Sequence, residues 1–183
     1  DEQALQTENV RKMLLGFSRD LRVVMLRLTS RLQTLRYHAE IKRPVSHNLA
    51  EESLNVFAPL ANRLGIWQVK WEMEDLAFRF LEPQTYREVA RLLDEKRAER
   101  EVLMEQLRAQ LEAELLAKGV RASVQGRPKH IYSIVKKMRG KSLGFDQVFD
   151  IRALRVVVSS VSDCYAALSW VNEKVEPIVE EFD

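Results

Sequence analysis

The sequence predicts an α+β protein, with an all-α first part over residues 1–118 and a mixed second part over residues 119–183. Through most of the first part, apolar residues recur at intervals of three and four, which is typical of amphipathic helices. After Gly119, residues 120–124 alternate like a strand and residues 148–158 are rich in β-branched side chains. The chain is 46% hydrophobic, which is enough to bury a core.

Helices are expected wherever the apolar period is three to four. A first helix is predicted over residues 10–36, and after a loop a second helix begins near Ser46 or Asn48, either of which is a good N-cap. The second helix should run to Leu64, because Gly65 is a typical residue just beyond a helix end.

Two further helices complete the expected first part. One contains Trp67 and ends at Pro83, and we interpret its aromatic residues as core packing. Next, Thr85 and Glu88 match a capping box, which predicts one long, charge-rich helix that ends before Gly119.

The mixed part is expected to alternate strands and helices. Helices are predicted over residues 131–138 and 162–174, between and after the two strands. The resulting hypothesis has three segments: residues 1–83, a connecting helix over 84–118, and residues 119–183.

Composition narrows the classes of function. The 29 basic and 27 acidic residues leave a net charge of only +2, which gives no reason to expect a whole-surface binder of nucleic acid or membrane. Cys164 is the single cysteine, so a cysteine-based zinc site is excluded and a reducing cytoplasm is the expected location. The three histidines have no metal-ligand spacing, so no protein-only metal site is expected here.

A local basic cluster stands out from this balance. Eight basic residues and no acidic ones occur between Leu115 and Phe145. Gly126-Arg127-Pro128-Lys129-His130 follows the first predicted strand, so a phosphate group could bind its cations and the N–H groups at the start of the next helix. Two alternatives stay open, namely a solvated basic helix and an RNA site with Tyr132 as a stacking ring.

Two aspartates follow the cluster. Asp150 stands at the beginning of the second predicted strand, where its carboxylate could hold a magnesium ion that is shared with a bound polyphosphate. Asp146 follows Gly144 and Phe145, and we interpret it as a turn residue.

These residues carry a family resemblance. Gly126-Arg-Pro-Lys-His-Ile-Tyr-Ser-Ile134, then Lys136-Lys137-Met138, then residues 145–155 resemble the opening of the RelA/SpoT-type synthetase domain. Residues 57–66 and 70–78 resemble the family's connection from its HD-type hydrolase domain to the synthetase. The resemblance thus implies the end of a hydrolase-like helical domain, followed by the first part of a nucleotidyltransferase-like synthetase domain.

The resemblance also implies a reaction. Members of the family transfer pyrophosphate from ATP to the ribose 3′-hydroxyl of GDP or GTP and so make (p)ppGpp, the signal of the stringent response, with magnesium required. Carried onto this sequence, Arg127, Lys129 and Lys137 would hold ATP phosphates, Ser133 would be a lesser ATP contact, and Asp150 would be the catalytic magnesium ligand. The family's acceptor tyrosine and second carboxylate belong to a later segment, so residues 1–183 are expected to be an inactive fragment.

Two further features resemble the synthetase-only branch of the family. Ser30 and Thr34 stand where hydrolysing members carry aspartate and asparagine, and Glu181-Phe-Asp183 resembles an acidic loop that is basic in bifunctional members. A serine hydroxyl is a poor manganese ligand, so hydrolase activity is expected to be absent. The polar side chains of that helix would then be solvated or locally hydrogen-bonded.

Rival hypotheses stay open beside the synthetase. The chain could be a non-catalytic nucleotide- or RNA-binding regulatory module, or its hydrolase part could work through unconventional ligands. For the parent protein the resemblance implies ATP and GTP or GDP as substrates, and ribosome association through regions outside this chain. No run in the sequence approaches the roughly 18 apolar residues of a membrane span, so no membrane partner is expected.

Overall fold

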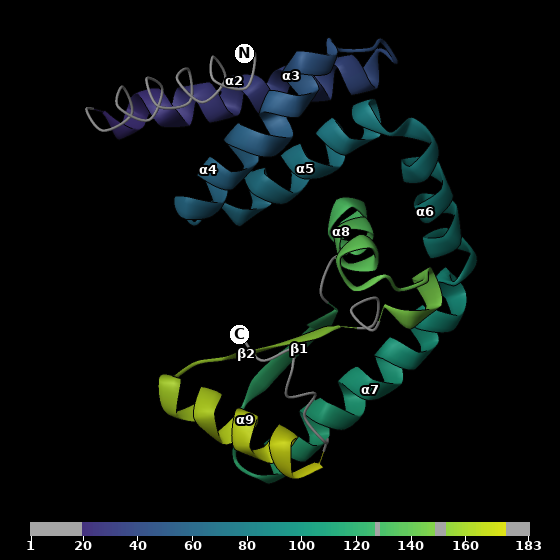
Figure 1. Ribbon diagram of the computed structural model, residues 1–183. Helices are drawn as coiled ribbons and strands as arrows, with labels where there is room; N and C mark the ends of the chain where they lie inside the picture. The colour runs from purple at the N-terminus through teal and green to yellow at the C-terminus, as the bar shows by residue number, and fades with distance from the viewer. Residues whose placement is uncertain (1–19, 127–128, 149–152, 175–183) are drawn as a thin grey trace. The chain divides into compact units, whose positions relative to one another are not determined.

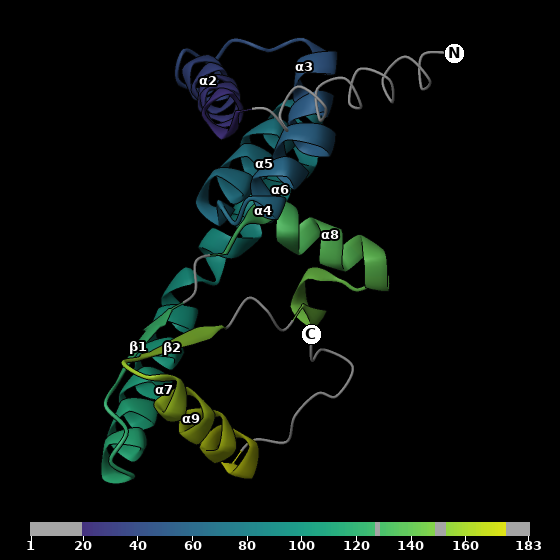
Figure 2. The same ribbon diagram turned by 90° about the vertical axis from the view of Figure 1, so that its left-hand side faces the viewer.

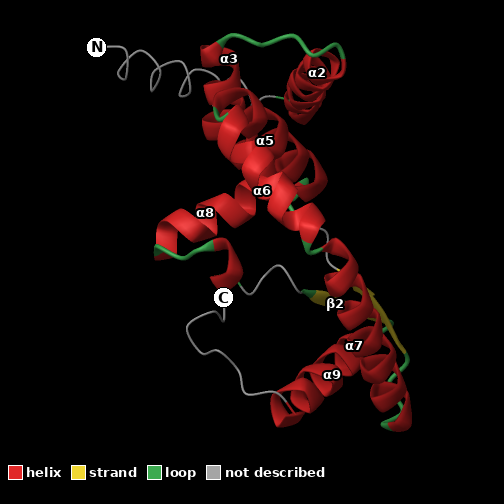
Figure 3. Ribbon diagram, turned by 90° about the vertical axis from the view of Figure 1, so that its right-hand side faces the viewer, coloured by secondary structure: helices red, strands yellow, loops and turns green. Residues whose placement is uncertain are grey.

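The computed structural model describes residues 20–126, 129–148 and 153–174. Its elements are traced along the chain in Figure 1, and Figure 3 shows that helices make up most of them, which together with one small sheet confirms the α+β class. The chain divides into two compact units. The first contains the chain up to Ala90 together with His130–Lys136, and the second contains Arg91–Lys129 and the chain from Lys137 onward.

The first unit is built on helices α2 and α5. The buried stripe of α2 (Leu21–Glu40) has the spacing expected for an amphipathic helix, and it packs against α5 (Trp67–Leu81) in one apolar core. Figure 1 shows α2 and α5 side by side with the shorter helices between residues 47 and 63. The core side chains come from α2, from the shorter helices and from α5: Val24, Leu28, Leu32, Leu35, Phe57, Ala58, Ala61 and Met73.

Most predicted ends in this unit are confirmed. The Ser46 hydroxyl accepts a hydrogen bond from the Leu49 N–H at 3.3 Å, so Ser46 is the N-cap. Gly65 has a φ of +73°, the left-handed conformation that favours glycine after a helix. For the helix predicted over residues 10–36, the part before Asp20 lies outside the described residues.

The second predicted helix is divided by a wider turn. Helix α3 (His47–Glu52) and helix α4 (Ala58–Arg63) flank a π-helical segment, η1 (Ser53–Phe57), in which the Ala58 N–H donates to the carbonyl five residues earlier. The wider turn immediately precedes Pro59, which has no N–H to offer the helix ladder. The guanidinium of Arg31 donates to the Leu49 carbonyl at 3.0 Å, which ties α2 to this segment.

The long helix predicted after Pro83 is wrong in two respects. It is two helices, α6 (Pro83–Glu95) and α7 (Arg97–Ala117), which are separated at Lys96. Thr85 lies inside α6, because Pro83, with its fixed φ, already begins the helix. The Thr85 hydroxyl donates to the Glu82 carboxylate at 3.2 Å instead of capping with Glu88.

The second unit contains the sheet. Strand β1 (Ala122–Gly126) pairs antiparallel with β2 (Leu154–Val158), and Val124 lies opposite Val156. Helix α7 packs against β1 and helix α9 (Val161–Lys174) against β2, as Figure 2 shows. Leu115, Val120 and Ala167 are buried at the centre of this packing.

Both strands and both helices predicted after Gly119 are confirmed in kind. Helix α8 (Ile131–Lys141) is one turn longer than predicted, and its first residues belong to the first unit. The second predicted strand begins only at Leu154, and residues 149–152 lie outside the described part of the chain. The three-segment division of the chain stays a prediction.

None of the helices that the structure describes is both long enough and apolar enough to cross a bilayer.

Candidate nucleotide-binding site

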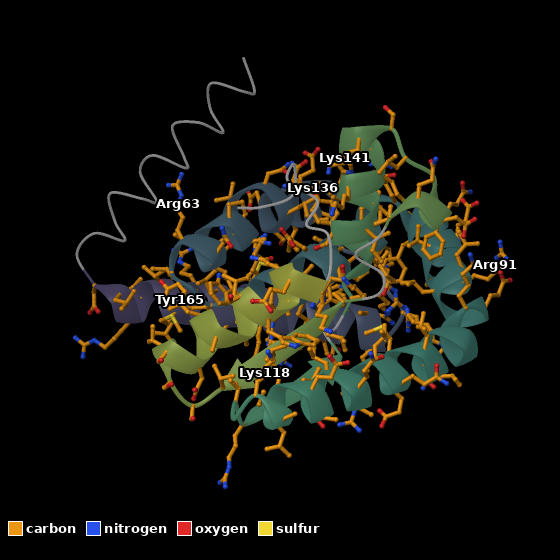
Figure 4. The ribbon with its side chains drawn as sticks, turned by 90° about the horizontal axis from the view of Figure 1, so that it is seen from below. Arg63, Arg91, Lys118, Lys136, Lys141 and Tyr165 are labelled. Carbon is orange, nitrogen blue, oxygen red and sulfur yellow. The ribbon has the colours of Figure 1, made fainter. Side chains whose placement is uncertain are left out.

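Helix α8 carries two of the predicted ATP contacts. Ser133 and Lys137 are four residues apart on α8, so they lie on one face of the helix, one turn from each other. The Ser133 side chain is exposed and that of Lys137 is half-buried. Lys136 and Lys141, which Figure 4 labels, also come from this helix. Helix α8 therefore presents a hydroxyl and an ammonium group on one face and is basic in its second half.

Of the other predicted site residues, the structure describes Lys129 but not Arg127 or Asp150. Lys129 is half-buried in the loop just before α8. Arg127 and Asp150 lie outside the described residues, so their predicted roles stay predictions. The structure therefore brings Ser133 and Lys137 together on one helix and tests neither the first cation of the cluster nor the magnesium ligand.

The first turn of α8 is held by a carboxylate. Oδ1 of Asp75 accepts the Tyr132 N–H at 2.8 Å, and Oδ2 accepts the Ile131 N–H at 3.2 Å. These N–H groups are among those that a helix leaves without an internal partner. The prediction that the N–H groups at the start of this helix bind a phosphate is therefore wrong for Ile131 and Tyr132, because a side-chain anion already occupies them.

Two ring contacts adjoin this carboxylate. The imidazole of His130 stacks on Trp71, with 4.9 Å between the ring centroids and 18° between the ring planes. The ring of Tyr132 lies 5.4 Å from that of Phe78, centroid to centroid. Tyr132 therefore packs against α5, which weakens the alternative in which its ring stacks on an RNA base.

Burial raises the pKa values of two adjacent carboxyl groups on α5, those of Asp75 and Glu74. Burial raises the pKa of the Asp75 carboxyl, and the Tyr132 N–H bond and the nearby His130 oppose that rise. The neighbouring Glu74 is also buried, and its burial likewise raises its pKa, against the opposing charge of Lys70.

Asp75 was missed by the sequence reasoning, although the sequence holds a signal for it. Asp75 follows Trp71 by four residues and precedes Phe78 by three, so it stands on an apolar face of the helix. A carboxylate in such a position needs a hydrogen-bonding partner. The partner itself could not be found, because Ile131 and Tyr132 are 56 and 57 residues further along the chain.

Asp146 and Arg155 lie in the segment that resembles the synthetase domain. Asp146 lies in a single 3-10 turn, η2 (Phe145–Gln147), and pairs with Lys96, which confirms its interpretation as a turn residue. Arg155 is exposed on β2, where it lies opposite Gln125 of β1.

The helix that resembles a hydrolase active-site helix has local polar contacts. The Thr34 hydroxyl donates to the Ser30 carbonyl at 3.0 Å, and Ser30 and Gln33 are exposed, as expected. In the part of the chain that the structure describes, no group of three or more His, Cys, Asp or Glu side chains is placed to hold a metal ion.

Two family profiles match the sequence. Residues 1–67 match the HD domain, and residues 126–183 match the region found in RelA / SpoT proteins. The second match contains α8, the preceding basic loop and strand β2.

Curated proteins are similar over nearly the whole chain. Identity is 47% to the GTP pyrophosphokinase of Photobacterium angustum over 99% of this chain, and 47% to that of Escherichia coli over 97%. It is 42%, over 97% of this chain, to a Synechocystis protein named as a probable guanosine-3′,5′-bis(diphosphate) 3′-pyrophosphohydrolase. The chain spans about a quarter of the length of these relatives: 24%, 24% and 23%.

Proposed function

Because this chain belongs to the RelA/SpoT family, we propose that it is the segment of a GTP pyrophosphokinase that joins an HD-type helical domain to the first part of the synthetase domain. The observation that carries the proposal is the basic helix α8, with Ser133 and Lys137 on one face, inside the RelA/SpoT region. The 47% identity to two proteins named GTP pyrophosphokinase supports it.

The proposed reaction transfers pyrophosphate from ATP to the 3′-hydroxyl of GTP or GDP. The 3′-hydroxyl loses its proton as its oxygen bonds to the β phosphorus, the bond from that phosphorus to the oxygen bridging the α phosphate breaks, and AMP leaves with that oxygen. Such a reaction depends mainly on positioning and on charge stabilisation, so cations around the phosphates can supply most of the catalysis.

Each candidate residue has a proposed role in that reaction. Arg127, Lys129 and Lys137 would bind the ATP phosphates, and the Ser133 hydroxyl would add a hydrogen bond. Asp150 would bind a magnesium ion that neutralises phosphate charge. Because Asp75 takes the N–H groups of Ile131 and Tyr132, the phosphates would be bound by side chains of this helix and not by these two N–H groups.

The deciding experiment follows (p)ppGpp formation from labelled ATP and GDP with magnesium in the full-length protein. Lys137→Ala should lower the rate roughly 10- to 1000-fold, because it removes a cation that stabilises the transferred group. Lys141→Ala is the matched control, since this lysine ends the same helix and has no proposed contact with ATP. A folded protein that binds ATP without transfer would favour the non-catalytic binding module instead.

We also propose that the hydrolase part is inactive, because Ser30 and Thr34 replace the carboxylate and amide that the resemblance implies for manganese binding. The Synechocystis relative makes a direct test necessary, since its name is that of a hydrolase. The full-length protein, given ppGpp and manganese, should release no pyrophosphate. Manganese-dependent release would contradict this proposal and favour unconventional ligands.

Three further expectations belong to the same proposal. Residues 1–183 alone should not turn over substrate, because the family's acceptor-site residues belong to a later segment. The full-length protein should be cytoplasmic and should associate with the ribosome through regions outside this chain.

A further inference from the structure

Asp75 connects helix α5 to the helix that carries the proposed ATP contacts. Its two carboxylate oxygens accept one N–H each, from Ile131 and Tyr132. These are the first two residues of α8, so the carboxylate acts as the helix cap although it comes from a distant part of the chain.

The rings on either side reinforce this connection. Trp71 stacks on His130 one helical turn before Asp75, and Phe78 contacts Tyr132 one turn after it. Three successive turns of α5 therefore hold three consecutive residues at the start of α8. Such an arrangement fixes the rotation of α8 about its axis as well as its position.

We propose that Asp75 is a positioning residue for pyrophosphate transfer, one that fixes the rotation of α8 and so the direction in which Ser133 and Lys137 point. The inference rests on the proposed function. In this role Asp75 acts through α8, because its two oxygens hold the N–H groups of Ile131 and Tyr132.

The surroundings suit a carboxylate in this role. The Asp75 side chain is 20% exposed, so water competes weakly for its oxygens. Helix N-termini favour a negative charge, and hydrogen bonds to a charged acceptor are stronger than neutral ones. Nδ1 of His130 lies 3.7 Å from Oδ2, close enough for attraction when the imidazole is protonated.

Loss of the Asp75 contact should lower the catalytic efficiency with ATP and leave the KM for the acceptor nucleotide nearly unchanged. A misplacement of about 1 Å in a reacting group can lower a rate by roughly 100-fold. Asp75→Ala should therefore lower kcat/KM for ATP by roughly 10- to 100-fold. The KM for GDP should change by less than about twofold, because the acceptor does not bind α8 in the proposed site.

The variants separate geometry from charge. Asp75→Asn keeps one oxygen acceptor and replaces the other with an NH2 group, which cannot accept the second N–H, so its loss should be smaller than that of Asp75→Ala but not absent. Asp75→Glu keeps the charge but adds one methylene, so it should show an intermediate loss at an unchanged melting temperature. Glu72→Ala is the matched control, because Glu72 is an acidic residue of α5 that pairs with Arg36 of α2.

The experiment measures initial rates against ATP and against GDP in the full-length protein, with melting temperatures for every variant. The inference is supported if Asp75→Ala loses ATP efficiency, Asp75→Asn loses less, and Glu72→Ala retains it. It is overturned if folded Asp75→Ala keeps wild-type kinetics, or if Asp75→Asn or Glu72→Ala loses as much as Asp75→Ala. If Asp75→Ala does not fold, Asp75→Glu decides, and wild-type ATP kinetics in that variant would overturn the inference. A folded wild type without transfer would overturn the proposed function and this role together.

Discussion

Nζ of Lys70 lies 3.5 Å from Oε2 of Glu74, one turn further along helix α5. The Glu74 side chain is only 9% exposed, and Oε2 has no hydrogen-bond donor among the described residues. Burial raises the pKa of Glu74, and the charges of Lys70 and Lys136 only partly oppose the rise. Lys70 therefore compensates a buried charge and adds little stability beyond that.

The first prediction tests whether Lys70 only offsets the buried charge of Glu74 or also adds stability to the fold. Lys70→Met should lower the free energy of unfolding by about 1–3 kcal/mol, because it leaves the Glu74 carboxylate buried without its cation. The double variant Lys70→Met, Glu74→Met should recover most of that loss, since an apolar pair needs no charge partner. Urea unfolding of the two variants measures the difference, and equal losses in both would refute the interpretation.

The second prediction concerns pH. The pKa of Glu74 is raised above its usual 4.5, so the folded state binds the proton more tightly and stability falls as the pH rises through 4.5 toward the folded pKa. Asp75, whose pKa is also raised, works in the same direction. Glu74→Gln removes the contribution of Glu74, so its melting temperature relative to wild type should rise between about pH 4 and pH 7. A relative melting temperature that falls over this range would contradict the assignment.

The third prediction compares two glycines. Gly119 follows α7 with a φ of +81°, a conformation that strains any residue with a Cβ, although no atom lies within 4 Å of the Cβ position. Gly119→Ala should therefore lower the free energy of unfolding by about 1–2 kcal/mol. Gly140 lies inside α8 with the same open space and no positive φ, so Gly140→Ala should raise it by about 0.5–1 kcal/mol.

If Gly119→Ala lowers the free energy of unfolding and Gly140→Ala raises it, backbone conformation is the cause of the difference, because neither substitution meets a steric obstacle. Thermal or urea unfolding of both variants gives the comparison. Two stabilising substitutions would show that the chain relaxes around residue 119 at little cost.

Local sequence patterns predicted the fold well where the spacing of residues within one helix or strand determines which side chains are buried. The apolar period of α2 contains Val24, Leu28, Leu32 and Leu35, which are buried in the core, whereas Leu21 and Met25 of the same pattern are exposed. The alternation over residues 120–124 predicted the first strand, and the β-branched run over residues 148–158 predicted the second. The break at Lys96 could not be found this way, because the apolar and charged pattern continues across it.

Only those features of the candidate site that depend on residues close together in the sequence could be predicted. Ser133 and Lys137 share a helix face, and this follows from their spacing alone. The capping of α8 by Asp75 depends on how α5 and the start of α8 pack together, and no local pattern contains that information. The same gap explains the wrong prediction for the first N–H groups of α8, because an available helix start and an occupied one have the same sequence signature.

The fourth prediction tests the core that surrounds Asp75. Phe78 is 1% exposed, and its ring lies 6.5 Å from that of Tyr86 and 5.4 Å from that of Tyr132. Phe78→Ala should lower the free energy of unfolding by about 3–5 kcal/mol, and Phe78→Leu by about 1–2 kcal/mol, because leucine refills most of the volume. Urea unfolding monitored by near-ultraviolet circular dichroism reports both stability and tyrosine packing. Equal losses in the two variants would mean that ring contacts outweigh buried volume.

The last prediction concerns the outer edge of β1. Oε1 of Glu112 accepts the Val124 N–H at 2.8 Å, while Oε2 accepts from Arg108 at 2.9 Å. Glu112 of α7 therefore occupies a backbone donor that would otherwise be available to a strand of another molecule. Glu112→Ala should lower the free energy of unfolding by about 1–3 kcal/mol and increase aggregation, because it leaves this half-buried N–H unpaired.

Two variants isolate the role of that hydrogen bond. Glu112→Gln keeps an acceptor for Val124 and should stay within about 0.5 kcal/mol of wild type with no added aggregation. Glu105→Ala removes another carboxylate partner of Arg108, one that is exposed on α7, so its effect should also be below about 0.5 kcal/mol. Light scattering during mild heating measures aggregation, and urea unfolding measures stability. If Glu105→Ala aggregates as readily as Glu112→Ala, the loss of surface charge is the cause, and β1 is not protected by Glu112.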